Sequence, residues 1–113
     1  MADDIPQLVK AAEAALNAGR WNEAETIWIE VRRRDPRNAR AAFSLGVHAM
    51  QRRDFAGACS LLEEARTANP QDLFTLLTLS KARREKGDEA GEGEALDAAL
   101  TVDPYYLPAL LGK

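Results

Sequence analysis

The chain has 113 residues, a formal net charge of −3 and 46% hydrophobic residues, which is the composition of an ordinary globular protein rather than of a disordered segment. One cysteine and one histidine exclude a disulfide framework, a cysteine-rich zinc site and a histidine-based metal centre. The mild acidity gives no reason to expect nucleic acid, and no apolar run approaches the roughly 18 residues of a membrane span. The acidic N-terminus does not resemble a secretory signal, so a cytoplasmic location is expected.

The first expected helix covers residues 5–18. Asp4 is a suitable N-cap, and Gln7 follows it at the spacing of a capping box. Gly19 provides a C-terminal stop, because glycine readily adopts the left-handed conformation that ends many helices. The pattern therefore predicts a helix with both ends defined by local sequence.

The second expected helix runs from Asn22 to the residue before Asp35-Pro36, since a residue that precedes proline disfavours helical backbone. Glu25 would complete a capping box with Asn22. Trp28 is expected in the core, and Trp21 at the surface or at an interface. Because only a few residues join the two helices, they should pack antiparallel.

The same two-helix pattern returns at a period of 34 residues. Three prolines mark this period: Pro36, Pro70 and Pro104. The small residues Ala12, Gly46 and Ser80 share one register and indicate points where helices approach closely. The later helices are expected at residues 38–52, 55–68, 72–86 and 89–101. The repeats would cover residues 5–38, 39–72 and 73–106, with a partial fourth unit at 107–113.

A 34-residue helix–turn–helix unit that ends in proline resembles the tetratricopeptide repeat (TPR) family. The motifs that carry this resemblance are Trp21-Asn22-Glu23-Ala24-Glu25, Leu45-Gly46, Asp54-Phe55-Ala56-Gly57-Ala58, Gly87-Asp88 and the three prolines. It covers essentially the whole chain and implies an all-α fold, an α-solenoid of three TPR units plus the start of a fourth, as a single array over residues 1–113. Stacked units should share one continuous core, because a lone helical pair cannot bury its apolar face.

The resemblance also implies a concave groove, lined by the first helix of each unit, that binds a peptide or a protein segment. The matching positions are Val9, Glu13, Leu16, Arg40, Phe43, Ser44, Val47, Met50, Gln51, Phe74, Leu77, Thr78, Lys81 and Arg84. This face is unusually apolar and has a basic fringe. It either binds an apolar or mildly acidic segment, or packs on another part of the same polypeptide or on a second copy.

Some members of the family hold the acidic C-terminus of a chaperone with a clamp of Lys, Asn and Arg side chains. The matching positions here are Val9, Glu13, Ser44, Phe74 and Thr78. None of these residues supplies the amide or cation that the clamp requires. The sequence therefore argues against a carboxylate-clamp co-chaperone.

The third unit departs from the pattern, because Arg83 and Glu92 stand where the other units have alanine. Both positions should face between the two helices of the unit, and a buried charge is far less costly when it is paired. We therefore predict a structural ion pair between Arg83 and Glu92. Gly91 and Gly93 each weaken a helix by about 1 kcal/mol relative to alanine, so residues 89–101 should form the least stable helix.

No catalytic constellation is visible. Cys59 and His48 both lie within expected helices and are interpreted as packing residues, since neither has partners that indicate an active thiolate or a metal ligand. No catalytic residue, metal site or cofactor is predicted. The expected partner is a protein or peptide, a downstream domain of the same polypeptide, or a second copy of the chain.

The segment 107–113 matches the beginning of the first unit, which suggests that the chain is the N-terminal part of a longer protein. The span from Leu8 to Gly112, with Leu45-Gly46-Val47-His48 and Asp103-Pro104-Tyr105-Tyr106, is similar to the TPR region of bacterial aspartyl/asparaginyl β-hydroxylase-like proteins. This resemblance implies a downstream domain that binds iron and 2-oxoglutarate, which His48 alone cannot do. Three functions therefore remain open: an interaction module, a substrate-positioning segment of such an enzyme, and a self-association element.

Overall fold

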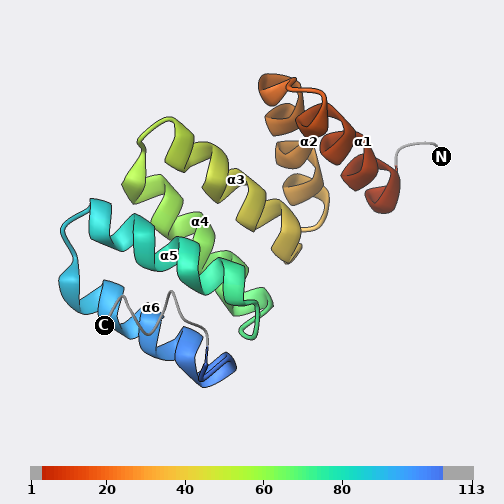
Figure 1. The fold of residues 1–113 in the computed structure, drawn as a ribbon. Helices are drawn as coiled ribbons and strands as arrows, with labels where there is room; N and C mark the ends of the chain where they lie inside the picture. Colours follow the sequence, from red (N-terminus) through yellow and green to blue (C-terminus); the bar gives the residue numbers. More distant parts are fainter. Residues whose placement is uncertain (1–3, 106–113) are drawn as a thin grey trace.

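A computed structural model describes residues 4–105 as three antiparallel pairs of helices (Figure 1). The helices are α1 (Ile5–Asn17), α2 (Trp21–Arg34), α3 (Ala39–Gln51), α4 (Phe55–Ala68), α5 (Leu73–Glu85) and α6 (Glu89–Val102). Each expected helix end lies within one residue of the observed end, and the all-α solenoid is confirmed. The expected fourth unit at 107–113 lies outside the described residues.

The three pairs follow one another in a row, with the first and last helices at opposite ends (Figure 1). Neighbouring pairs contact each other through α2 with α3 and through α4 with α5, and α3 also touches α5. The molecule is elongated, with principal extents of 46 × 25 × 24 Å. Helix α3 touches α5, and an ion pair between Arg40 and Glu13 joins α3 to α1, so the first helices of the three pairs contribute to one face.

Helix α1 is capped as the sequence predicts, because the Asp4 carboxylate accepts a hydrogen bond of 3.0 Å from the backbone N–H of Gln7. The capping box expected at Asn22 and Glu25 is wrong. Helix α2 begins at Trp21 with Arg20 in the N-cap position and without a side-chain cap. Asn22 therefore lies inside the first turn, where its side chain cannot serve as the cap.

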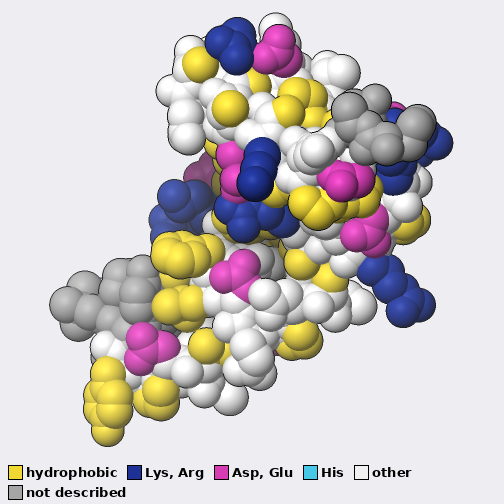
Figure 2. Space-filling view, turned by 90° about the vertical axis from the view of Figure 1, so that its right-hand side faces the viewer, with side chains coloured by type: hydrophobic (Ala, Val, Ile, Leu, Met, Phe, Trp, Pro, Cys, Tyr) yellow, Lys and Arg dark blue, Asp and Glu magenta, His cyan; other side chains and the backbone are white. Residues whose placement is uncertain are grey.

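The buried residues form three clusters along the stack, which consist mainly of alanine and leucine with one large aromatic residue, and the partly buried Leu61 packs against the first two clusters. Trp28 is buried, as expected, while Trp21 is 43% exposed. His48 and Cys59 are buried as well, in agreement with their interpretation as packing residues. Figure 2 shows that on one face the exposed hydrophobic side chains are interrupted by Lys, Arg, Asp and Glu, so that they form several separate patches.

Gly46 marks a close approach between α3 and α4, as the row of small residues predicts. A Cβ atom built on Gly46 would lie 2.8 Å from Cγ and 2.9 Å from Cδ2 of Leu62. Leu62 is fully buried, so a shift of its side chain would disturb the packing of its neighbours. The position therefore requires a residue without a side chain.

Gly46→Val should lower the free energy of unfolding by about 2 kcal/mol, because the added carbons overpack the junction of α3 and α4. Gly93→Val is the matched control, since no atom lies within 4 Å of a Cβ built there. It should change stability by less than about 0.5 kcal/mol. Urea denaturation followed by circular dichroism measures both, and equal losses at the two sites would contradict the close approach.

Candidate functional site

Two neighbouring hollows lie on the face formed by α1, α3 and α5. The first has a volume of about 550 Å³ and takes residues from all three pairs. Its lining consists of Glu13, Leu16, Trp28, Ala39, Arg40, Phe43, Ser44, Asn69, Asp72 and Phe74. Phe74 is 68% exposed although Leu76 on the same helix is buried. The first hollow is thus a largely apolar recess with an exposed aromatic ring at its edge.

The charged side chains around the first hollow already have partners within the chain. Arg40 forms an ion pair with Glu13, which joins α3 to α1. The Asp72 carboxylate accepts a hydrogen bond of 2.7 Å from the Thr75 hydroxyl. Arg40 and Glu13 thus neutralise each other, while the Asp72 carboxylate is hydrogen-bonded but keeps its charge, so the first hollow offers mainly apolar contact and no uncompensated cation.

The second hollow has a volume of about 500 Å³ and lies between the later parts of α3 and α5. Val47, Met50, Gln51, Arg53, Thr78 and Lys81 line it. The Thr78 hydroxyl donates a 2.7 Å hydrogen bond to the carbonyl of Phe74 within its own helix. Within residues 4–105 neither Arg53 nor Lys81 forms an ion pair with a carboxylate, so this hollow carries two cationic groups.

The structure brings most of the predicted groove residues to these two hollows. Six of them line the first hollow and five line the second. Val9 and Leu77 instead pack against the core as partly buried side chains. Arg84 lies on an exposed surface, where it pairs with Glu92 at 3.1 Å.

Arg53 lines the second hollow and was missed by the sequence analysis. Its φ of 63° is left-handed, like the φ of 79° at Gly19 and 84° at Gly87. Arg53 lies 34 residues from each of these glycines, so the same turn recurs in all three units with arginine in the middle one. This conformation costs a residue with a side chain about 1–2 kcal/mol. The repeat register could have identified Arg53, because it places this arginine at a position that is glycine in the other two units.

The predicted ion pair between Arg83 and Glu92 is wrong. Arg83 donates to Glu94 at 2.8 Å, to Glu63 at 2.9 Å and to the carbonyl of Gly91 at 2.8 Å. Positions 92 and 94 lie on different faces of a helix, because two residues correspond to about 200° of rotation. Glu94 therefore faces Arg83, and Glu92 pairs with Arg84. Arg83 is charged and paired as expected, but with other carboxylates.

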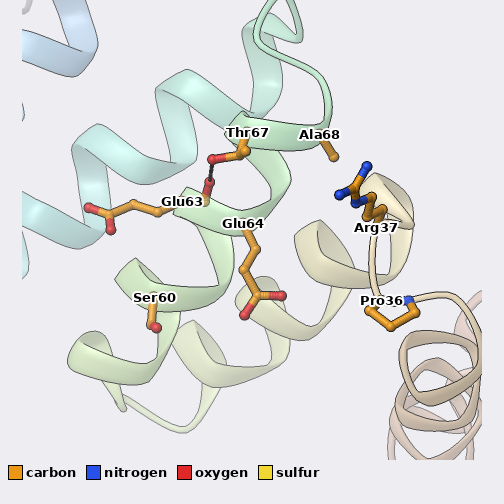
Figure 3. A pocket seen from close by; sticks show the side chains of 7 residues that line it. All are labelled: Pro36, Arg37, Ser60, Glu63, Glu64, Thr67 and Ala68. Carbon is orange, nitrogen blue, oxygen red and sulfur yellow. Dashed lines mark hydrogen bonds between the residues drawn. The ribbon is translucent and has the colours of Figure 1, made fainter.

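A hollow of about 750 Å³ lies on α4 and on the loop between α2 and α3 (Figure 3). Its carboxylates are committed to pairs between helices. The guanidinium of Arg32 donates to both oxygens of Glu64 at 3.0 and 2.6 Å, and Glu63 accepts from Arg83. Figure 3 shows the Thr67 hydroxyl turned back onto the carbonyl of Glu63, to which it donates at 3.0 Å. This hollow lies at the junction between repeats, and most of its polar side chains are already hydrogen-bonded within the protein.

A smaller hollow of about 260 Å³ contains Trp21, His48 and the ion-paired Glu25 and Arg52. The Trp21 and His48 rings meet edge to face, with centroids 5.4 Å apart. Burial lowers the pKa of His48, and burial raises the pKa of the Cys59 thiol. Both groups are therefore neutral at neutral pH, as expected of packing residues.

Residues 4–105 offer neither a cluster of metal ligands nor a membrane-spanning helix. No group of three or more His, Cys, Asp or Glu side chains in this part of the chain could hold a metal ion. None of its helices is long and apolar enough to cross a lipid bilayer.

Stacked antiparallel helix pairs define a helical-repeat protein. The family model for the tetratricopeptide repeat matches residues 9–72, and the chain therefore belongs to the TPR family. No curated protein sequence matches. The resemblance to aspartyl/asparaginyl β-hydroxylase-like proteins receives no support from these comparisons.

Solved structures share the fold at low sequence identity. The chain is similar to MamA, with a TM-score of 0.86 and 19% identity over 94% of this chain and 62% of that one. It is also similar to the first TPR of Spaghetti (RPAP3) bound to the HSP90 peptide SRMEEVD, with a TM-score of 0.85 and 17% identity over 96% and 86%. An O-GlcNAc transferase of Thermobaculum terrenum is similar with a TM-score of 0.83 and 24% identity, over 96% of this chain and 21% of the transferase chain. This chain thus spans less than two thirds of the MamA and transferase chains.

Proposed function

We propose that this chain is a non-catalytic scaffold that binds an extended peptide, or a segment of a partner domain, along the face of α1, α3 and α5. The observation that carries the proposal is Phe74, an aromatic side chain that is 68% exposed at the edge of an apolar hollow. An exposed aromatic group beside a recess is typical of an interface, because burying it on a partner is favourable. The two hollows have the volumes usual for binding sites.

The chemistry of the first hollow favours an apolar side chain of the partner. The structural relative Spaghetti (RPAP3) is solved with an acidic HSP90 peptide, but the cation in this hollow, Arg40, is neutralised by Glu13. None of the residues at the clamp positions supplies a cation or an amide. A partner that inserts a bulky apolar side chain beside Phe43 and Phe74 therefore fits better than a terminal carboxylate.

Phe74→Ala should weaken peptide binding about tenfold, because truncation of a central aromatic contact commonly costs 1–2 kcal/mol. Heptapeptides selected by phage display on the purified chain supply the ligand, and fluorescence polarisation gives the Kd. Since Phe74 is exposed, the free energy of unfolding should change by less than about 0.5 kcal/mol.

Ile29→Ala is the control, because Ile29 is 54% exposed but lines none of the hollows described above. It should leave the Kd unchanged. If both variants bind the selected peptides as tightly as the wild type does, the proposed face is not the binding surface. Light scattering at several concentrations separates peptide binding from self-association.

A further inference from the structure

The second hollow contains an arginine in an unfavourable backbone conformation. Among residues 4–105, Arg53 is the one non-glycine residue with a positive φ. The other two units have Gly19 and Gly87 in the same turn, so the fold itself is satisfied by glycine. Residues held in such conformations cluster at functional sites. The turn alone therefore does not explain why residue 53 is an arginine.

Arg53 lines the hollow, and within residues 4–105 its guanidinium has no anionic partner. It lies over the Phe55 ring, 5.5 Å from the centroid, which holds the side chain by a cation–π contact. Lys81 lines the same hollow, together with the polar side chains of Gln51 and Thr78. In the described part of the chain neither cation is ion-paired, whereas Arg32, Arg66 and Arg83 are each paired with glutamate. The hollow is thus lined by two cationic residues that no carboxylate in residues 4–105 neutralises.

The two hollows lie in succession along α3. Phe43 lines the first and Met50 lines the second, and both are on one continuous helix. Seven residues make about two helical turns, so the two side chains share a face and are separated by roughly 10 Å along the axis. An extended peptide advances about 3.3 Å per residue, so that distance corresponds to about three residues.

We propose that the second hollow binds a carboxylate side chain of the peptide whose apolar side chain occupies the first hollow, the two being about three residues apart. Arg53 and Lys81 are the groups that bind the carboxylate. The preferred partner is thus an extended segment with one bulky apolar residue and one Asp or Glu at that spacing. This inference rests on the proposed function and adds a charge preference to it.

A set of fluorescein-labelled serine-rich peptides tests the spacing. Each contains one Phe and one Glu, in either order and at successively larger spacings, and each has a matched peptide with Gln in place of Glu. At low ionic strength the Glu peptide should bind about fivefold more tightly than its Gln partner, and the ratio should be greatest at a spacing of about three residues. The ratio should fall towards one in about 0.5 M NaCl, because salt screens the attraction.

Arg53→Gly separates the binding role from a structural one. Glycine relieves the left-handed backbone, so the melting temperature should rise by about 4 °C while the preference for Glu falls at least twofold. Arg53→Lys should keep the preference. Arg33→Gln removes an exposed cation on α2 and is the control, which should bind like the wild type.

The outcomes distinguish this inference from the proposed function. If Phe peptides bind but the Glu and Gln peptides are equal at every spacing, the carboxylate site is refuted and the peptide groove stands. An undiminished Glu preference in Arg53→Gly and in Lys81→Gln would likewise overturn the assignment. If no Phe peptide binds, the proposed function itself fails.

Discussion

Trp28→Ala should lower the free energy of unfolding by about 3–5 kcal/mol, the largest effect expected from a single substitution in this chain. Trp28 is 1% exposed and packs with Val31 and Leu45, so its removal opens a cavity between the first two units. Urea denaturation followed by far-UV circular dichroism measures the loss.

Trp28→Phe should cost much less, under about 2 kcal/mol. The indole Nε1–H of Trp28 is buried without a hydrogen-bond partner in the described structure, and a buried unpaired donor is itself destabilising. Phenylalanine removes that donor while it fills most of the space. If the Phe and Ala variants lose equal stability, the space filled by the aromatic ring is not what Trp28 contributes.

Trp21→Ala is the control for both Trp28 variants. Trp21 is 43% exposed and meets His48 at one edge only, so its loss should cost less than about 1 kcal/mol. Both substitutions replace tryptophan by alanine on the same helix, so a difference between their stability losses reports the difference in burial. A larger loss at Trp21 than at Trp28 would contradict the core assignment.

Helix positions could be predicted from the sequence because the signals that set them are local. The capping carboxylate of Asp4 and the prolines after α2 and α4 act within a few residues of the helix end. Because the pattern repeats every 34 residues, a helix boundary found in one unit predicts the matching boundary in the next. The error at α2 has the same origin, since Arg20 occupies a cap position that Asp54 and Asp88 fill in the later units.

The lining of the two hollows could be predicted where it follows from helix periodicity, but not where burial depends on neighbours. Phe43 and Met50 line the hollows and also pack against the core, whereas Val9 and Leu77 pack against the core and line neither hollow. Helix register gives the direction of a side chain, but it does not tell how closely a neighbouring helix packs over that side chain. Arg53 required a different comparison, between a cation and the glycines in the same turn of the other units.

The partners of Arg83 could not be predicted from the repeat, because a long side chain can reach several helices. Arg83 on α5 pairs with Glu63 on α4 and Glu94 on α6. Arg66 on α4 also binds Glu94, through two hydrogen bonds of 2.7 and 2.6 Å. Three helices are thus joined by one network, and only the packing of adjacent repeats determines which carboxylates it contains.

Arg83→Ala should therefore lower the free energy of unfolding by about 2–3 kcal/mol at pH 7. Only 13% of the Arg83 side chain is exposed, so the loss includes its packed stem as well as its three hydrogen bonds. Its carboxylate partners are about half exposed, and solvent screening keeps the loss below that of a fully buried pair.

The loss should depend on pH in a defined direction. Hydrogen bonds from Arg66, and then from Arg83, lower the pKa of Glu94 from 4.5 to about 2. A carboxylate whose pKa is depressed by folding stabilises the protein above its unfolded pKa, and this contribution disappears as pH falls from 4.5 towards 2. The difference in stability between the wild type and Arg83→Ala should shrink across that interval. A difference that stays constant from pH 7 to pH 2 would show that the ion pairs contribute nothing.

Substitution of the two candidate glutamates decides which one stabilises Arg83. Glu94→Gln should lower the free energy of unfolding by about 1 kcal/mol at neutral pH, a value reduced because half of the side chain is exposed. Glu92→Gln, which disturbs only the pair with the 65% exposed Arg84, should cost less than about 0.5 kcal/mol. The reverse order would restore the pair expected from the sequence, because it would mean that Glu92 is the carboxylate that compensates the buried charge of Arg83.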